Sequence, residues 1–152
     1  MDAAAIARIY NEGIKDRLAT FETRPRTSAD VEPWFESGFP LVVVEQSGEV
    51  VGWASAPPYR EREAYDGVRE FSVYVDRSRR GEGLGRAAMR ALISECGARG
   101  YWKLVSRIFP ENEASRALCR ALGFREVGVY RRHAKLDGEW RDCVIVELLL
   151  ND

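Results

Sequence analysis

The segment from Arg79 to Arg86 constrains the fold more than any other, because it places glycines at the alternate positions 81, 83 and 85. It follows a β-rich run, 70–75, and leads into a helical pattern that opens at Leu84. Glycines leave backbone N–H groups uncovered, and the unpaired N–H groups of a helix's first turn add a partial positive charge. This glycine loop therefore predicts a strand, loop and helix that bind phosphate groups. A turn that serves close packing alone is the alternative.

Two common phosphate-binding motifs do not fit the spacing of the glycine loop. A Walker loop needs Gly-Lys-Ser/Thr after its four spacer residues, and no such tripeptide follows here. A Rossmann fingerprint needs its third glycine three residues after the second, where this chain has Arg86. The loop therefore favours the pyrophosphate of some other cofactor.

Length and charge point to one domain with a small-molecule ligand. The 152 residues, 45% of them hydrophobic, predict a single domain over 1–152 with one core. A formal net charge of -1 gives no basic field for nucleic acid or an anionic membrane. No apolar run approaches the ~20 residues of a membrane span, and the amino terminus lacks a signal pattern. We expect a cytoplasmic protein without nucleic-acid or membrane partners.

The cysteines and the histidine argue against a disulfide framework or a metal site. Cys96, Cys119 and Cys143 are far apart and lie in apolar patterns, which predicts reduced, mostly buried thiols. His133 is the only histidine, and no Gly-x-Ser-x-Gly elbow accompanies it. Neither a zinc site nor a Ser-His-Asp triad is therefore expected, and we predict no metal.

Hydrophobic periodicity and turn residues give the order of the elements. The predicted elements are a helix over 3–13, a helix capped by Thr27 or Ser28 with Pro33 near its first turn, a hairpin over 41–54, the strand run 70–75, a helix from Leu84 closed by Gly100, a strand over 101–109, a helix from Asn112 to Gly123, and a hairpin over 124–150 that turns at Asp137-Gly138. The strand-helix-strand connection predicts that 101–109 runs parallel to 70–75. The fold class is α/β (α+β), a mixed sheet flanked by helices.

Several motifs in combination resemble the GNAT acetyltransferase superfamily. They are Arg80-x-x-Gly83-x-Gly85, then Asn112-x-x-Ser115-x-x-Leu118, then Leu122-Gly123-Phe124. The chain is most similar to the amino-acid N-acetyltransferases that inactivate phosphinothricin and methionine sulfoximine, through Tyr10-Asn11, Ala19-Thr20-Phe21-Glu22, the run 70–75 and Lys135-x-x-Gly138-x-Trp140-x-Asp142. Tyr59-Arg60-x-Arg62-x-x-Tyr65 and the segment 102–107 most resemble the arsinothricin-resistance branch. The resemblance runs nearly end to end.

The resemblance implies a central, mostly antiparallel sheet with a splayed parallel pair. Relatives usually begin with a strand, whereas here a helical pattern follows Met1 at once, so the usual first strand is expected to be missing. The edge left exposed favours association, and the family implies a homodimer. Cys119 stands where many relatives carry a tyrosine or histidine as candidate acid, so the acid is unassigned and a core cysteine is favoured.

The resemblance also implies acetyl-CoA as cosubstrate. Its pyrophosphate is expected on the amides of 80–85 and its pantetheine along the backbone of 71–75. The expected cofactor-binding residues are Phe71, Ser72, Val73, Tyr74, Val75, Arg80, Gly81, Glu82, Gly83, Leu84, Gly85, Arg86, Asn112 and Ser115.

Glu70 matches the position that the resembled enzymes use as general base. An amine attacks a thioester only when it is unprotonated, so a carboxylate must remove its proton directly or through one water. The alternative is a salt-bridged glutamate at the start of a strand. Around the last hairpin, His133, Lys135, Trp140 and Asp142 are expected either to shape the acceptor site or a dimer contact, or to form only a polar turn.

Arg60, Arg62, Tyr65 and Phe21 are the expected acceptor-binding residues, since guanidinium groups fit a carboxylate and a phosphinate or arsenic oxyanion. A solvated basic loop is the alternative. The sequence thus predicts an acetyl-CoA-dependent N-acetyltransferase for the α-amino group of a small acidic amino acid of the arsinothricin, phosphinothricin or methionine sulfoximine type, which would confer resistance. A GNAT enzyme for a polyamine or a protein amino terminus, and a non-catalytic acetyl-CoA-binding module, are the alternatives.

Overall fold

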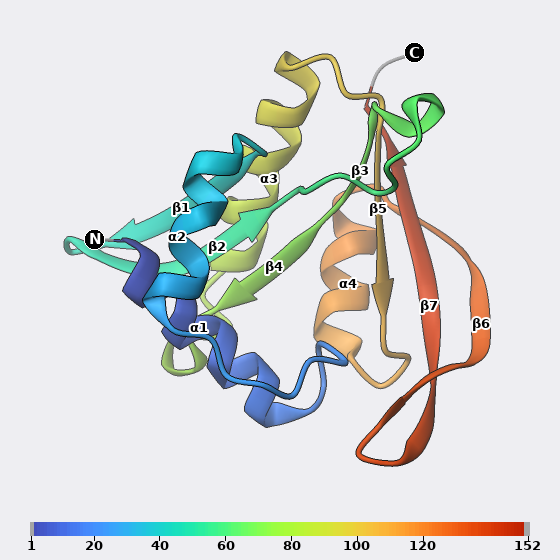
Figure 1. Ribbon diagram of the computed structural model, residues 1–152, viewed down its shortest axis with the longest axis horizontal. Helices are drawn as coiled ribbons and strands as arrows, with labels where there is room; N and C mark the ends of the chain where they lie inside the picture. The colour runs from blue at the N-terminus through green and yellow to red at the C-terminus, as the bar shows by residue number, and fades with distance from the viewer. Residues whose placement is uncertain (1, 151–152) are drawn as a thin grey trace.

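The computed structural model describes residues 2–150, which form helices and strands in the predicted order (Figure 1). The helices are α1 (Asp2–Asp16), α2 (Ser28–Ser37), α3 (Leu84–Ala98) and α4 (Glu113–Ala121), with short 3-10 helices η1 (Glu63–Tyr65) and η2 (Arg77–Arg79). The strands are β1 (Leu41–Gln46), β2 (Glu49–Ser55), β3 (Val68–Glu70), β4 (Ser72–Val75), β5 (Lys103–Ile108), β6 (Arg125–Leu136) and β7 (Glu139–Leu149). This confirms the mixed α/β class.

The strands form two sheets that part at Phe71. One sheet has the order β1-β2-β4 and is antiparallel, and the other has the order β3-β5-β7-β6. Only β3 and β5 run parallel, with Glu70 opposite Val105, so the splayed parallel pair is confirmed. The sequence predicted one strand over 70–75 parallel to the next. This detail is wrong, because β4 leaves β5 after Phe71 and pairs with β2 instead.

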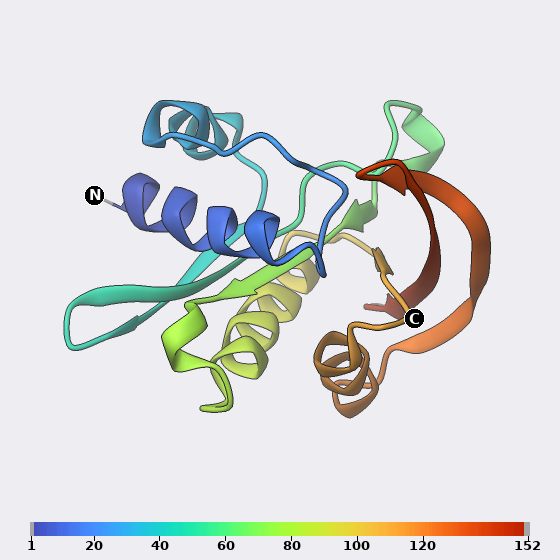
Figure 2. The same ribbon diagram turned by 90° about the horizontal axis from the view of Figure 1, so that it is seen from below.

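Helices cover both faces of the three-stranded sheet. Figure 2 shows α1 and α2 on one side and α3 on the other, and α4 lies on the same side as α3. The buried face of α1 is the predicted one, with Ile6, Ile9 and Ile14 at most 3% exposed. A larger core joins α3 and α4 to both sheets, through Ala54, Phe71, Met89, Leu92, Leu104, Cys119, Phe124, Val144 and Val146.

The caps that the sequence predicted are formed. Thr27 caps α2, since its side chain accepts from the Asp30 N–H while the Asp30 carboxylate accepts from the Thr27 N–H. Asn112 caps α4 with one hydrogen bond, since its side chain accepts from the Ser115 N–H. Pro33 is further along than predicted: it lies in the second turn of α2, where the missing N–H removes one helical hydrogen bond.

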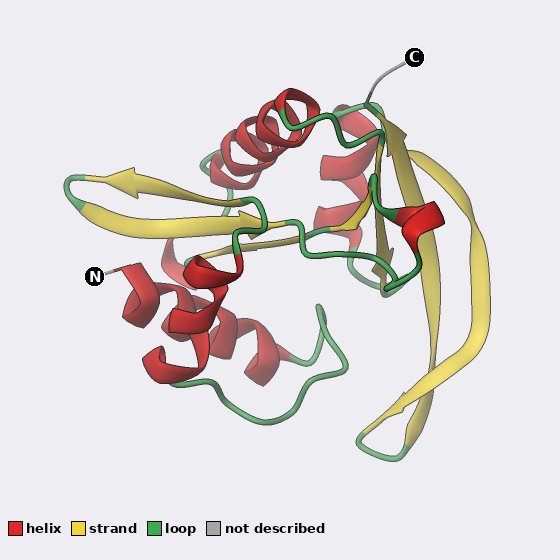
Figure 3. Cartoon of the chain, turned by 45° about the horizontal axis from the view of Figure 1, so that its top comes forward, coloured by secondary structure: helices red, strands yellow, loops and turns green. Residues whose placement is uncertain are grey.

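The edge strands are β1 and β4 in the three-stranded sheet, and β3 and the long strand β6 in the four-stranded sheet (Figure 3). Within residues 2–150, no strand pairs with the outer side of β1. In the four-stranded sheet, the edge strand β6 is bulged near Gly128 and between Tyr130 and Ala134, and most of its residues are exposed. No helix within residues 2–150 is long and apolar enough to cross a membrane.

Candidate functional site

The glycine loop presents bare backbone at the amino end of α3. Gly81 and Gly83 have φ of 87° and 79°, in the left-handed region that favours glycine, and a Cβ at either would meet no atom within 4 Å. Gly83 caps α3 without any side-chain hydrogen bond. The first helical bond runs from the Ala87 N–H to the Gly83 carbonyl, so the N–H groups of 84–86 lie outside the helical ladder. These groups can bind an anion.

A cavity of about 560 Å³ opens over this loop and is called the glycine-loop cavity. Its lining comes from the end of α1, β4, the glycine loop and α4, and includes Val73, Tyr74, Val75, Arg80, Gly81, Gly83, Leu84, Gly85, Arg86, Asn112 and Ser115. The Leu84 side chain is buried, so this residue contributes backbone. Arg80 pairs with Asp16 at 3.1 Å, and the exposed Glu82 lies 3.9 Å from Arg79. Most of the predicted cofactor residues therefore meet at one cavity.

The edge of β4 borders the same cavity. Among residues 2–150, β2 is the only strand that pairs with β4, so the other edge of β4 is left without a strand partner. Phe71 differs from the expectation for the run 71–75. Its N–H donates to the Val105 carbonyl at 3.0 Å, its carbonyl accepts from Ser106 Oγ at 2.9 Å, and its ring is buried. The backbone that a ligand could pair with is therefore reduced to Ser72–Val75.

A second cavity of about 530 Å³, the Glu70 cavity, adjoins the first. The two share the lining residues Ala19, Val73, Tyr74, Asn112, Ser115 and Leu118. Glu70, Phe21, Ser106 and Arg107 line only the second. Asn112 also ties α4 to the end of α1, because its side-chain N–H donates to the Leu18 carbonyl at 3.4 Å. A ligand in the glycine-loop cavity can thus reach a partner molecule beside Glu70.

Glu70 is held by an arginine that the sequence did not single out. Arg107 Nε and Nη2 lie 3.0 and 2.9 Å from the same oxygen, Glu70 Oε2. Arg107 Nη1 also approaches the ring nitrogen Nε2 of His133 at 3.5 Å. The sequence signal for Arg107 was weak, because it is one of two cations, with Lys103, in the β-rich run 101–109, and a solvated strand face also contains such cations.

Of the four expected acceptor-binding residues, one lines the Glu70 cavity and three do not. Phe21 lines the Glu70 cavity, where its ring meets Phe109 edge-on at 4.8 Å. Arg60, Arg62 and Tyr65 lie on the exposed segment between β2 and β3, outside the described lining of that cavity. Arg60 stacks over Tyr59 at 4.1 Å. The structure thus does not bring these three side chains together with Glu70.

The three cysteines are free and buried, as expected. Cys119 and Cys143 line the Glu70 cavity. Burial raises the pKa of the Cys119 thiol to about 12 and also raises the pKa of Cys143, so both hold their protons near neutral pH. No group of three His, Cys, Asp or Glu side chains in the described residues could hold a metal ion.

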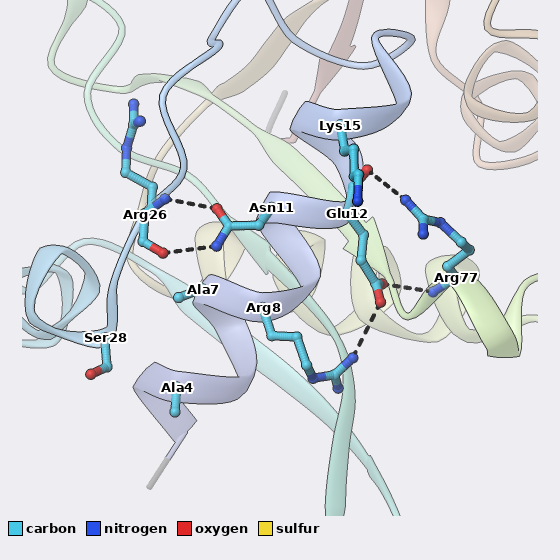
Figure 4. Close-up of a pocket in the computed structure, with 9 residues that line it drawn as sticks. All are labelled: Ala4, Ala7, Arg8, Asn11, Glu12, Lys15, Arg26, Ser28 and Arg77. Atoms are coloured by element: carbon cyan, nitrogen blue, oxygen red, sulfur yellow. Dashed lines mark hydrogen bonds and ion pairs between the residues drawn. The ribbon is translucent and has the colours of Figure 1, made fainter.

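A third cavity, of about 440 Å³, lies over α1 (Figure 4). Several of its polar groups contact one another. The Asn11 amide binds the backbone of Arg26 through two hydrogen bonds of 2.8 and 2.7 Å, and Glu12 accepts from the Arg77 N–H at 2.9 Å and pairs with Arg8 at 3.4 Å. These contacts join α1 to the segments before α2 and after β4, which is a structural role.

Comparison with known proteins agrees with this geometry. The family model described as "Acetyltransferase (GNAT) family" matches residues 6–124. An L-methionine sulfoximine/L-methionine sulfone acetyltransferase from Pseudomonas aeruginosa is 34% identical, over 99% of this chain and 90% of that protein. A GNAT phosphinothricin acetyltransferase from Sinorhizobium meliloti, solved in complex with acetyl-CoA, superposes with a TM-score of 0.91 at 32% identity, over 99% and 84% of the two chains.

A further solved structure carries a different name. A ribosomal-protein-alanine N-acetyltransferase from Brucella melitensis superposes with a TM-score of 0.94 at 35% identity, over 98% and 94% of the two chains. The family model alone spans well over half of the chain, and the relatives align over nearly all of it. The chain therefore belongs to the GNAT acetyltransferase family.

Proposed function

We propose that this protein is an acetyl-CoA-dependent N-acetyltransferase that acts on the α-amino group of a small acidic amino acid. The observation that carries the proposal is the pair of adjoining cavities, one over the glycine loop and one beside Glu70. A bisubstrate transfer needs both ligands to meet, and the shared lining at Val73 and Ser115 is where they would do so.

The residues present fit acetyl-CoA. The uncovered backbone at Gly81 and Gly83 and the N–H groups of 84–86 would hold the pyrophosphate, with Arg80 and Arg86 beside it. The open edge of β4 would pair with the amides of the pantetheine arm. Bound there, acetyl-CoA would supply the acetyl thioester that the acceptor amine attacks. The acetyl-CoA complex of the Sinorhizobium relative supports this assignment.

Glu70 is the proposed general base. An α-amino acid carries a protonated amine at neutral pH, and Glu70 would take one proton from it, which frees the nitrogen lone pair for attack. Arg107 fixes the orientation of the carboxylate through two N–H contacts to Oε2. Cys119 retains its proton, yet a thiol is a weak donor, so the acid for the departing thiolate stays unassigned.

The proposed acceptors are phosphinothricin, methionine sulfoximine and arsinothricin, whose acetylation would confer resistance. The names of the Pseudomonas and Sinorhizobium relatives support the first two, and the arsinothricin motifs of the sequence support the third. Phe21 would contact the acceptor directly. Arg60, Arg62 and Tyr65 stay predicted ligands of its oxyanion, and they would have to reach the cavity from the exposed segment before β3.

We also propose a single-domain, cytoplasmic homodimer. Three free, buried thiols fit a reducing compartment. Apolar side chains on the edge strand β6 are about half exposed, with Val127 at 45%, Val129 at 53% and Tyr130 at 52%. Exposed apolar residues on an unpaired edge favour burial against a second copy.

The test is release of CoA thiol, measured against phosphinothricin, methionine sulfoximine, arsinothricin, spermidine and an alanine-terminated peptide. The proposal predicts the highest kcat/KM for the amino acids. A preference for the peptide would favour the second candidate, acetylation of a protein amino terminus, which the name of the Brucella relative supports. Binding of acetyl-CoA without thiol release above hydrolysis for any acceptor would favour a non-catalytic binding module.

A further inference from the structure

The ion pair between Arg107 and Glu70 is built by the register of the parallel strands. Glu70 is opposite Val105, and Arg107 is two residues further along β5, so its side chain projects from the same face as that of Val105. Both charged groups line the Glu70 cavity, and they remain partly open to it, with side chains 47% and 25% exposed. A cation and an anion are thus presented side by side to whatever occupies the cavity.

The contacts to Glu70 do not use all the hydrogen-bond donors of the Arg107 guanidinium. Of its five N–H groups, those on Nε and Nη2 that contact Glu70 Oε2 account for two. In the described chain, Nη1 has only the long 3.5 Å approach to His133 Nε2. The Nε and Nη2 edge of the planar guanidinium is therefore bound to Glu70, and its remaining N–H groups can bind an anion from the cavity side.

An α-amino acid carries its ammonium and carboxylate groups on one carbon, so its two charges are adjacent in the same way. We propose that the Arg107–Glu70 pair recognises this zwitterion, with the acceptor's α-carboxylate bound by Arg107 and its ammonium group by Glu70. This inference rests on the proposed function. In this arrangement Arg107 determines which acceptors are selected. The acceptor's ammonium group lies against the Glu70 carboxylate, which is the group proposed to take its proton.

The proposed contact discriminates among amines by what stands next to the nitrogen. Spermidine and a peptide amino terminus offer an ammonium group to Glu70 but no carboxylate on the neighbouring carbon. Arg107 would then keep only Glu70 as its anion, and the acceptor would forgo the charge-assisted pair between its own carboxylate and Arg107. Selection for free α-amino acids follows, whatever the side chain beyond them.

The experiment compares phosphinothricin with its α-carboxamide, which keeps the amine and the side-chain oxyanion and removes only the α-carboxylate. A charge-assisted hydrogen bond contributes about 1.5–3 kcal/mol, so kcat/KM of the wild type should favour the amino acid by roughly 10- to 100-fold. Arg107→Gln should remove this preference, mainly by raising KM for phosphinothricin. Arg107→Lys keeps the charge without the fork and should restore part of the preference.

Arg125→Gln is the matched control, because Arg125 forms a comparable surface ion pair with Glu147 on the same sheet, outside the lining of the Glu70 cavity. It should leave the preference unchanged. Equal losses for both acceptors in Arg107→Gln would mean that Arg107 only positions Glu70, and the inference would be overturned. A wild type without preference between the two acceptors overturns it even if Arg107→Gln does not fold. Failure of the wild type to acetylate any amino acid would instead remove the proposed function itself.

Discussion

Glu70 is the residue on which the proposed chemistry depends. It ends β3 where the two sheets part, so its carboxylate faces the cavity while its N–H is bound by the Pro57 carbonyl at 3.1 Å. The backbone is thus fixed on both sides of the carboxylate, since Phe71 is bound to β5 as well. A base held in this manner needs little reorganisation before it accepts a proton.

Glu70→Gln keeps the size of the side chain but cannot accept a proton. We expect kcat to fall by about 10²- to 10⁴-fold at neutral pH, with little change in the affinity for acetyl-CoA. Glu147→Gln is the control, because Glu147 is also paired with cations but lies outside the Glu70 cavity. Steady-state kinetics decide the matter: a kcat for Glu70→Gln within a few-fold of wild type would rule out the general-base role.

Among single residues, those that belong to a sequence motif could be predicted as site residues, whereas those that meet only through the pairing of strands could not. Glu70, Phe21 and Ser115 were predicted and line the adjoining cavities. Arg107 was not, because its pairing with Glu70 depends on strand register across 37 positions of the chain. Arg60 is near Glu70 in sequence, yet it lies on an exposed segment outside the lining of the cavity.

At the scale of elements, the glycine loop joins β4 to α3 and forms the proposed anion site. Its positive φ values and its helix start without a side-chain cap follow from glycine itself, which explains why the strand, loop and helix could be predicted from the sequence. Its binding of phosphate stays a prediction. The break at Phe71 could not be predicted, because 70–75 is one continuous β-rich run. The run is divided into two strands because its first part, β3, pairs with β5 and its second part, β4, pairs with β2.

Gly83→Glu should abolish binding of acetyl-CoA and leave the protein folded, because a carboxylate beside the pyrophosphate repels it. Gly83→Ala is the matched control. Both variants place a side chain at φ 79°, at a cost of about 1–2 kcal/mol, but only the first adds a charge. Titration calorimetry measures the difference. If folded Gly83→Glu bound acetyl-CoA as tightly as Gly83→Ala, the cofactor site would have been misplaced.

A second element-scale prediction concerns the approach of α1 to β4. Gly13 is buried in α1, and a Cβ there would lie 2.6 Å from the ring of Tyr74, which is stacked against Trp53. Gly13→Ala should therefore destabilise the fold by about 1–3 kcal/mol through overpacking. Gly97→Ala in α3, where a Cβ meets nothing within 4 Å, should stabilise it by about 0.5–1 kcal/mol. Urea denaturation that gave both variants the same sign would refute this packing.

At the scale of the whole molecule, two separate cores pack against the sheets. The α1–α2 layer covers one face of the three-stranded sheet, and the core shared by α3 and α4 joins both sheets from the other side (Figure 2). The cavities open between these cores, where β4 has no strand partner on its free side within residues 2–150. Of the four edge strands, β1 and β6 lie at the edges farthest from β4 and β3 and are left available for association.

We expect a homodimer at micromolar concentration. Val129→Lys should weaken it, because a charge on the half-exposed face of β6 is unfavourable once that face is buried. Glu139→Lys, an exposed charge substitution on β7, is the control. Sedimentation velocity of the wild type tests the prediction, and a monomer throughout that range would contradict it.

The central claim is that acetyl moves to the α-amino group of an acidic amino acid, and NMR of the product tests it most directly. Incubation of the enzyme with acetyl-CoA and phosphinothricin should give one product, with the new amide on the α-nitrogen. Formation should be slowed strongly by Glu70→Gln. Release of CoA without an acetylated amino acid, or acetylation of spermidine or a peptide in preference to phosphinothricin, would contradict the account.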